Sequence, residues 1–123
     1  MSLKHTYTIS IRNDTGGSVV NTEVITASAE ENLSDTVPAG ESKDYELPVD
    51  VDRIASFFVQ SDKDLTFSTD DQEFDLTAKK ALWWNSERLD TCPLTSDITT
   101  LTFDNTAGES DANIKVGFLL DLT

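Results

Sequence analysis

Apolar and polar residues alternate one by one through much of this chain, and a period of two is typical of an extended strand with one wet face. The clearest run covers residues 113–120, where Ile114, Val116, Phe118 and Leu120 fall on one side of an extended segment. The same alternation recurs in shorter runs, at residues 7–11, 45–49, 65–67, 74–76 and 101–103. The chain is therefore expected to fold as a series of short strands that each bury one face.

Turn-forming residues separate these runs, and over much of the chain they recur about every eight to twelve residues. This spacing predicts an all-β fold of about nine strands: an antiparallel two-sheet β-sandwich, jelly-roll-like, with an immunoglobulin-like sandwich as the alternative. No repeat or linker divides the sequence. Residues 1–123 are therefore expected to form a single domain.

Several longer segments carry more specific expectations. Residues 27–40 are polar and lack a period, which predicts a long loop, either a contact arm or a mobile connection. Residues 51–56 are the one candidate for a helical turn. Residues 57–61 begin apolar on both faces, as a central strand does. Pro48 places its own strand at a sheet edge or a strand end, because proline cannot donate to the ladder.

Three short polar segments predict tight connections. Residues 13–17 have the asparagine, aspartate and glycine content of a turn that follows the first strand. Residues 62–64 are expected to close a hairpin between the strands that flank them. Residues 105–108 are expected to close the last hairpin of the chain.

The chain carries 23 acidic and 9 basic residues, a net charge of −14. Such a charge repels phosphate backbones and anionic lipids, so neither nucleic acid nor a membrane is an expected partner. No stretch approaches the roughly 20 apolar residues of a membrane span, and the N-terminus lacks the pattern of a signal peptide. The acidity has three open explanations: solubility, an acidic binding surface or a salt-rich habitat.

The chain holds one cysteine and one histidine, which limits its chemistry. Cys92 cannot form an intramolecular disulfide, so an inert, reduced thiol is expected. His5 is expected to be a surface residue and not a metal ligand. Glycine-rich phosphate loops, nucleophile elbows and zinc motifs are missing from the sequence as well. We therefore expect a non-enzymatic protein that uses no metal and no cofactor.

Carboxylates are the remaining titratable candidates. Asp62 and Asp64 flank Lys63 and share one side of an extended segment, and residues 70–71 and 30–31 are adjacent acidic pairs. Paired carboxylates perform glycoside hydrolysis in some proteins and hold calcium in others. The sequence has no calcium-loop pattern, and a chain this acidic produces such pairs by chance. They are expected to be solvated turn residues, with Asp62 and Asp64 kept as candidate binding residues.

Trp83 and Trp84 are the strongest indication of a binding site. Adjacent residues of a strand face opposite sides, so one indole is expected in the core and the other outside it. An outward tryptophan stacks on a sugar ring or anchors a protein partner. The alternative is a strand that is covered on both faces. The same argument makes Phe57, in the pair with Phe58, a candidate binding residue.

Four segments in the second half of the chain follow a recurring pattern, at residues 61–66, 76–84, 97–105 and 112–119. They resemble small β-sandwich proteins from structural gene clusters of tailed bacteriophages and prophages, whose pattern reads S-D-x-D-V-T, L-x-A-G-x-P-L-x-W, D-V-T-x-L-x-V-T-N and A-x-L-x-I-x-V-L. The resemblance covers roughly half of the chain. Lys79 stands where the pattern has glycine and Ala81 where it has proline, which predicts a different turn before Leu82.

The resemblance implies a virion-associated structural or assembly protein. Its partners would be further copies of itself, in a homo-oligomer, or another virion protein, in the virion or in the host cytoplasm during assembly. By the pattern, Trp84 is the matching core tryptophan, which leaves Trp83 exposed. The alternative hypothesis is a carbohydrate-binding module that uses Trp83 as its platform.

Overall fold

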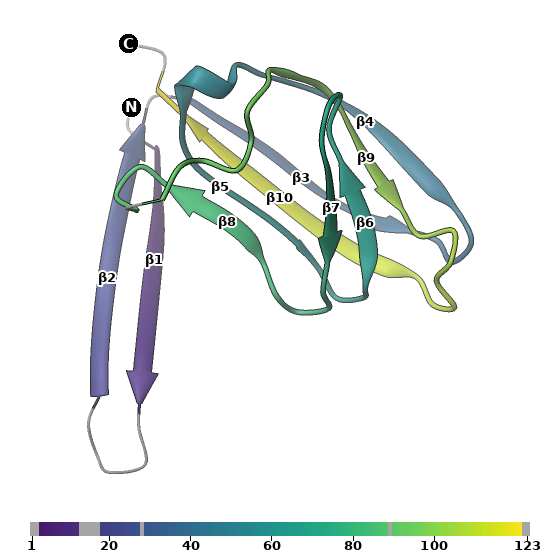
Figure 1. The fold of residues 1–123 in the computed structure, drawn as a ribbon, viewed down its shortest axis with the longest axis horizontal. Helices are drawn as coiled ribbons and strands as arrows, with labels where there is room; N and C mark the ends of the chain where they lie inside the picture. The colour runs from purple at the N-terminus through teal and green to yellow at the C-terminus, as the bar shows by residue number, and fades with distance from the viewer. Residues whose placement is uncertain (1–2, 13–17, 28, 89, 122–123) are drawn as a thin grey trace.

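The computed structural model describes residues 3–12, 18–27, 29–88 and 90–121. Its regular elements are ten strands and one short 3-10 helix, η1 (Val51–Arg53) (Figure 1). The strands are β1 (Leu3–Arg12), β2 (Ser18–Ala27), β3 (Ala29–Val37), β4 (Ser42–Val49), β5 (Ile54–Ser61), β6 (Leu65–Ser68), β7 (Glu73–Leu76), β8 (Leu82–Asn85), β9 (Ile98–Asp104) and β10 (Ala112–Leu120). Within these ranges no helix has the length and apolar content to cross a membrane. The expected turn at residues 13–17 lies outside the described residues.

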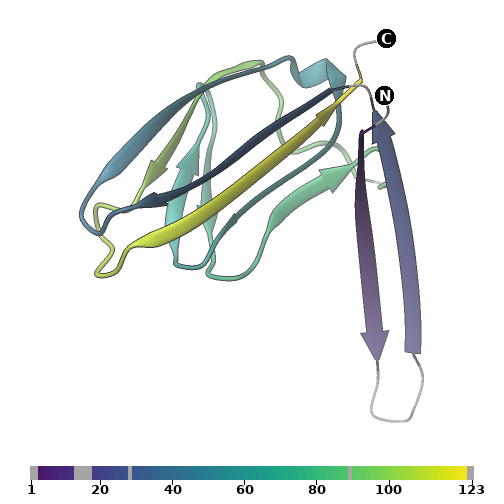
Figure 2. The same ribbon diagram turned by 180° about the vertical axis from the view of Figure 1, so that it is seen from behind.

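Eight of the strands form two antiparallel four-stranded sheets that pack face to face (Figures 1 and 2). The β10 sheet has the order β3-β10-β5-β8, and the β9 sheet has the order β4-β9-β6-β7. The pairing is nested: β3 pairs with β10, β4 with β9, β5 with β8 and β6 with β7, and successive pairs alternate between the sheets. This is the strand order of an eight-stranded jelly roll. The predicted two-sheet β-sandwich is therefore confirmed.

The core lies between the inner faces of the two sheets, and alternate residues of β6 and of the first half of β10 are buried in it. Phe57 and Phe118 stack there with ring centroids 5.6 Å apart. In the β9 sheet, the ring of Phe67 lies 5.9 Å from that of Phe74 and 5.1 Å from that of Phe103. Aromatic pairs at such separations add about 0.5–1.5 kcal/mol each beyond the area that they bury.

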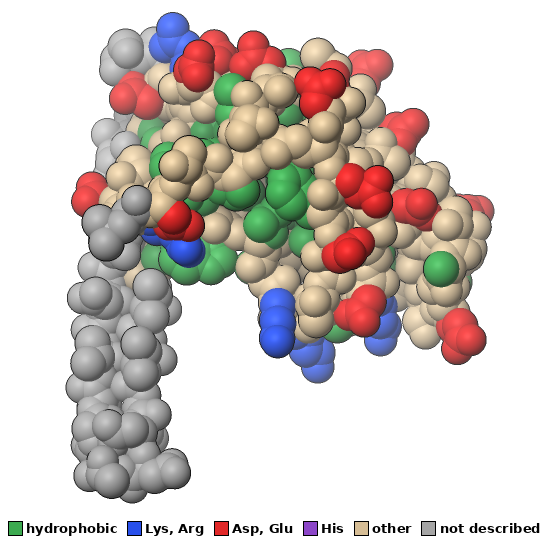
Figure 3. All heavy atoms as spheres, in the orientation of Figure 1, with side chains coloured by type: hydrophobic (Ala, Val, Ile, Leu, Met, Phe, Trp, Pro, Cys, Tyr) green, Lys and Arg blue, Asp and Glu red, His purple; other side chains and the backbone are tan. Residues whose placement is uncertain are grey.

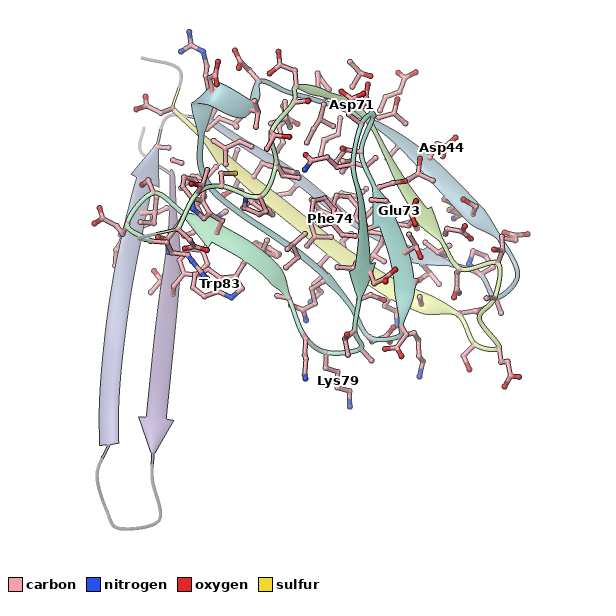
Figure 4. The ribbon with its side chains drawn as sticks, in the orientation of Figure 1. Asp44, Asp71, Glu73, Phe74, Lys79 and Trp83 are labelled. Atoms are coloured by element: carbon pink, nitrogen blue, oxygen red, sulfur yellow. The ribbon has the colours of Figure 1, made fainter. Side chains whose placement is uncertain are left out.

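The outer faces of the two sheets differ. The register of the β9 sheet sets Asp44, Thr102, Ser68 and Glu73 side by side on its outer face, which is polar (Figure 4). The outer face of the β10 sheet is covered at one end by β1 and β2. For this reason β10 is buried without interruption over residues 116–120.

β1 and β2 form a two-stranded hairpin, the arm, that belongs to neither sheet. Its strands pair one for one, from Leu3 with Ala27 to Arg12 with Ser18. The end near Leu3 and Ala27 lies against β5 and β10, and from there the arm extends away from the sandwich (Figures 1 and 2). We call the end that touches the sandwich the arm root.

The prediction of a loop at residues 27–40 is wrong, because β3 occupies most of this range and pairs with β10 along its length. Leu33 packs against the core, but Glu31 and Asp35 hold the flanking positions on the same face, which hides the period of two. These two carboxylates are tolerated because β3 is an edge strand of its sheet. Asp35 accepts a 2.6 Å hydrogen bond from the Tyr45 hydroxyl. Inward-pointing charges also protect an edge strand from pairing with other chains.

The predictions of hairpins at residues 62–64 and 105–108 are also wrong. β5 and β6 lie in different sheets, and so do β9 and β10. Both connections therefore cross from one sheet to the other, and they do so at the same end of the sandwich (Figure 1).

Three smaller predictions are confirmed. The expected helical turn is η1, whose start is capped by the Asp50 side chain. Pro48 lies in β4, an edge strand of the β9 sheet, and its position interrupts the pairing register with β9. β5, which contains Phe57 and Phe58, is a central strand of the β10 sheet.

Asn105 ties the two sheets together at the end where these connections cross. Its buried side-chain nitrogen donates to the backbone oxygens of Val37 (3.1 Å) and Ser110 (2.9 Å). Its backbone nitrogen donates to the Glu41 oxygen at 2.9 Å, and its backbone oxygen accepts from the Gly40 nitrogen at 3.0 Å. One residue therefore joins the end of β3, the turn after it and the connection before β10.

Asn105→Ala is expected to lower the free energy of unfolding by about 2 kcal/mol, because the carbonyls of Val37 and Ser110 lose a buried donor. Urea denaturation measures the change. Thr106→Ala is the control, since Thr106 is exposed in the same connection and its change is expected to stay within about 0.5 kcal/mol. Coincident unfolding curves for Asn105→Ala and the wild type would contradict the bridging role of Asn105.

Candidate functional site

The arm root is fixed to the sandwich by hydrogen bonds that converge on Ser56 of β5. The Nδ1 atom of His5 lies 2.7 Å from the Ser56 Oγ atom. The Tyr7 hydroxyl is hydrogen-bonded to the same Oγ atom and lies 3.4 Å from the backbone oxygen of Phe57. The His5 ring also packs against Phe58, with centroids 5.6 Å apart. Residues 49 to 51 positions apart in the sequence are brought together here.

Trp83 of β8 lies on the same outer face, next to the arm (Figure 4). The Tyr7 ring stacks on it with centroids 5.0 Å apart and an interplanar angle of 24°. The guanidinium carbon of Arg88 lies 4.4 Å from the indole centroid, and Asp90 holds that guanidinium through hydrogen bonds of 2.7 and 3.0 Å. A cation over an indole adds about 0.5–1 kcal/mol at exposed sites. Trp83 is therefore in contact with the arm of its own chain.

Trp84 faces the opposite side, as predicted from the alternation. It packs against the main core, and its indole nitrogen donates to the Asp90 backbone oxygen at 2.9 Å. The register places Phe57 opposite Trp84 and Phe58 opposite Trp83. The prediction that Phe57 is a binding residue is wrong, since its side chain is 0% exposed within the core. Phe58 is the residue of this pair that faces the arm.

A second, smaller buried region lies under the arm root. Ile25 of β2 and Leu119 of β10 are only 4% and 0% exposed, yet neither belongs to the main core cluster. Leu119 lies between Phe118 and Leu120, which both join the main core, so the period of two points it to the outer face. Among the described residues, the main core cluster therefore contains none from the arm, and the arm root adds an apolar contact of its own.

Gly117 of β10 makes room for this arrangement. A Cβ atom at Gly117 would lie 2.5 Å from the Cε1 atom of Phe58, closer than real Cβ contacts occur. The Phe58 ring therefore lies directly on the β10 backbone. Any side chain at Gly117 would push that ring toward His5 and the arm root.

Ser56, His5 and Glu30 have the residue types of a catalytic triad. The Nε2 atom of His5 lies 3.7 Å from Glu30 Oε2, and its other ring nitrogen contacts Ser56. A nucleophile must be reached by its substrate, and Ser56 is 0% exposed beneath the arm. The three residues therefore act as an anchor for the arm.

His5 is half-buried, so the expectation of a surface residue is wrong. Burial of the ring lowers its pKa, and the nearby Glu30 carboxylate opposes that shift in part. The neutral imidazole is the form that the docked arm favours.

Asp62 and Asp64 lie in the connection between β5 and β6, at the far end of the sandwich from η1. Asp62 accepts hydrogen bonds from the backbone nitrogen of Asn113 (2.7 Å) and from its side-chain nitrogen (3.0 Å), which together hold the pKa of Asp62 below its usual value. Asp64 accepts from the backbone nitrogen of Ala78 at 2.7 Å. Both line a shallow depression of about 400 Å³ with Lys63. Through these hydrogen bonds the two carboxylates stabilise the loops at this end of the sandwich.

The other titratable candidates have structural surroundings. Asp70 accepts hydrogen bonds from the Thr99 hydroxyl and from the backbone nitrogens of Thr99 and Thr100, which lower the pKa of Asp70 to about 2. Cys92 is a free, half-buried thiol whose pKa is raised by burial. Among the described residues, no group of three or more histidine, cysteine, aspartate or glutamate side chains is arranged to hold a metal ion.

Sequence reasoning missed most of the arm root. For Tyr7 the sequence did offer a signal, because it begins an alternating run and lies two residues after His5, the one histidine of the chain. Ser56 and Arg88 gave none, because their roles depend on partners that only the fold brings near.

No protein-family model and no curated protein matches this chain. Among solved structures, the chain resembles a de novo designed double-stranded β-helix determined by solution NMR. The superposition has a TM-score of 0.47 with 12% sequence identity, and it covers 72% of this chain and 97% of the designed one. The jelly-roll assignment above rests on the strand order of this chain itself.

Trp83→Ala is expected to loosen the arm root and leave the sandwich folded, because the Tyr7 ring loses its stacking partner. Hydrogen exchange at the amides of residues 3–7 should accelerate about tenfold, the equivalent of about 1.4 kcal/mol, with β9 unchanged. Trp84→Ala is the comparison, and it is expected to lower the global stability by about 3 kcal/mol through a core cavity. Equal global destabilisation by both substitutions would contradict the separation of the arm root from the core.

Acid is expected to weaken the arm root through His5. The pKa of His5 is about 6.5 in an unfolded chain and lower in the folded one. The stabilisation is therefore complete above about pH 6.5 and declines as the pH falls from there toward the lower folded value. Hydrogen exchange at residues 3–7, corrected for intrinsic rates, should reveal this loss, and His5→Phe should remove it. A profile that is unchanged by His5→Phe would reject this role of His5.

Proposed function

We propose that this protein is a non-enzymatic structural or assembly protein of a bacteriophage or prophage particle. The observation that carries the proposal is the arm. In the described residues its strands pair only with each other, and from the arm root, where they contact β5 and β10, they extend away from the sandwich (Figures 1 and 2). A two-stranded hairpin is marginally stable at best in water. An arm of this kind gains stability when a neighbouring protein covers it.

The arm root supports the same role. Stacking of Tyr7 on Trp83 and the hydrogen bonds to Ser56 set the direction in which the arm leaves the sandwich. A contact element held in one direction loses less conformational freedom on association than a loose tail. The exposed Val24, at 55%, adds apolar surface to the arm.

The sandwich itself also suits assembly. Its edge strands are β3 and β8 in one sheet and β4 and β7 in the other, and each leaves backbone groups on one side unpaired within its sheet. Edges of this kind pair with or pack against other chains.

We infer that the arm and the edge strands are buried against further copies of the protein, in a homo-oligomer, or against another virion protein. The net charge of −14 disfavours nucleic acid and anionic membranes as partners. The place of action is then the virion, or the host cytoplasm during assembly.

The carbohydrate-binding alternative loses support. A sugar platform needs an open indole face, and the Trp83 ring is contacted by Tyr7 and Arg88. A glycan would have to displace the arm root to stack there.

The proposal is tested with particles produced from the genome that encodes the chain. Mass spectrometry of purified particles is expected to find the protein at a fixed copy number, and its gene is expected among portal, capsid and tail genes. Tyr7→Ala should reduce incorporation. Thr6→Ala is the matched control, because Thr6 is exposed in the same strand. Absence from purified particles would reject the proposal, and saturable glycan binding that Trp83→Ala abolishes would favour the alternative.

A further inference from the structure

Charge is divided unevenly along this chain. Residues 1–27, which include the arm, carry two basic side chains, Lys4 and Arg12, and two acidic ones, Asp14 and Glu23. Their net charge is therefore zero, and the net charge of −14 belongs to the residues that follow. Figure 3 shows aspartate and glutamate side chains spread over the visible face of the sandwich. The arm is thus a neutral extension of an acidic sandwich.

The arm strands have the length and composition of strands that pair readily. β1 and β2 have ten residues each, whereas strands usually have about five or six. At least half of the residues in each strand are β-branched or aromatic, and neither strand contains proline or glycine. β1 contains no acidic residue. Among the described residues each arm strand pairs only with the other, so one edge of each has no neighbouring strand.

The edge strands of the sandwich, in contrast, have features that oppose strand pairing. β3 carries the carboxylates of Glu31 and Asp35 on its inner face, and β4 contains Pro48. β7 and β8 have only four residues each. Inward-pointing charges, proline and short length are means by which sheets keep their edges from pairing with other chains. β1 has ten residues, no proline and no carboxylate. Its edge is therefore better suited to bind another strand than the edges of the sandwich.

We propose that β1 of the arm pairs antiparallel, edge to edge, with β1 of a second copy of this chain. The two hairpins then form one four-stranded sheet, and a sheet needs three or more strands for independent stability. Because both copies use the same strand, the contact is isologous and closes as a dimer about a two-fold axis. The inference rests on the proposed assembly function, for which it names the partner and the contact.

The alternation in β1 sets the register of this contact. The part of β1 beyond the arm root is centred on Ser10. A two-fold axis there sets Ile9 opposite Ile11 of the second copy, so that apolar positions meet apolar positions. The same axis sets Thr8 opposite Arg12 of the second copy, and no two like charges face each other.

The acidic sandwiches of the two copies stay apart in this arrangement. A strand rises about 3.4 Å per residue, so an axis at Ser10 separates the Leu3 ends of the two arms by roughly 48 Å. Exposed charges are screened beyond a Debye length of about 8 Å at physiological salt. Each arm also extends away from its own sandwich (Figures 1 and 2). A second copy therefore supplies a neutral strand with a matching edge, while its net charge of −14 remains at a distance.

Thr8 and Thr22 form a matched pair for the test, because they are register partners at one level of the arm, in β1 and in β2. The wild type is expected to dimerise in sedimentation velocity at high concentration. Dimerisation should be at least as strong at about 500 mM salt as at 50 mM, since salt screens the repulsion between the sandwiches. Thr8→Lys sets a lysine opposite Arg12 twice per dimer and is expected to weaken dimerisation about tenfold. Thr22→Lys is expected to leave it within about twofold.

Thr8→Glu changes the sign of the effect. A carboxylate opposite Arg12 of the second copy is expected to strengthen dimerisation about threefold or more at low salt, and Thr22→Glu is expected to leave it within about twofold. All four variants should melt within about 2 °C of the wild type, because the described core contains no residue of the arm.

Hydrogen exchange locates the contact. Between dilute and concentrated wild type, alternate amides within residues 8–12 should slow about tenfold, because their N–H groups donate to the second copy. Amides of the edge strand β4 should exchange at the same rate in both samples.

A wild type that remains a 13.5 kDa monomer at every accessible concentration and at both salt levels would overturn the inference. So would equal effects of Thr8→Lys and Thr22→Lys, or a dimer in which the slowed amides belong to an edge strand of the sandwich. The proposed function survives these outcomes if the protein is still found in particles, where the arm would contact a different virion protein.

Discussion

Burial of one face of each sheet against the other is the interaction on which the rest of this structure depends. The stacked pair of Phe57 and Phe118 lies in one sheet, and Phe67 with Phe103 lies in the other. Because the core formed by the described residues contains no residue of the arm, the outer face of the β10 sheet is left available for a second attachment. The nested pairing also carries every connection from β3 to β10 to one end or the other of the sandwich.

The fold class followed from the sequence because alternation reports directly which residues face the core. The alternation did not predict β3, because Glu31 and Asp35 take inner-facing positions there, which an open sheet edge permits. Alternation also carries no information on pairing. Neighbouring strands were therefore expected to form hairpins across residues 62–64 and 105–108, whereas in a jelly roll consecutive strands there change sheets.

The candidate site was accessible to the same reasoning only in part. The opposite directions of Trp83 and Trp84 follow from a period of two and were predicted. Phe57 was misassigned because two adjacent apolar residues show that both faces of a strand are covered, but not which of them faces the core. Ser56 contacts His5 across 51 residues of sequence, and the local pattern around neither residue indicates the other. Contacts of this range need the fold.

The nested order also has a consequence for how the chain reaches this structure. β6 and β7 pair across a four-residue turn, whereas Thr36 of β3 meets Asn113 of β10 across 77 residues. Each outer pair closes a longer loop than the one inside it, and such non-local pairing slows folding to about milliseconds or seconds. During synthesis β3 emerges long before β10 can cover it. Until β10 is available, carboxylates in β3 disfavour its pairing with another nascent chain, and these belong to Glu30, Glu31 and Asp35.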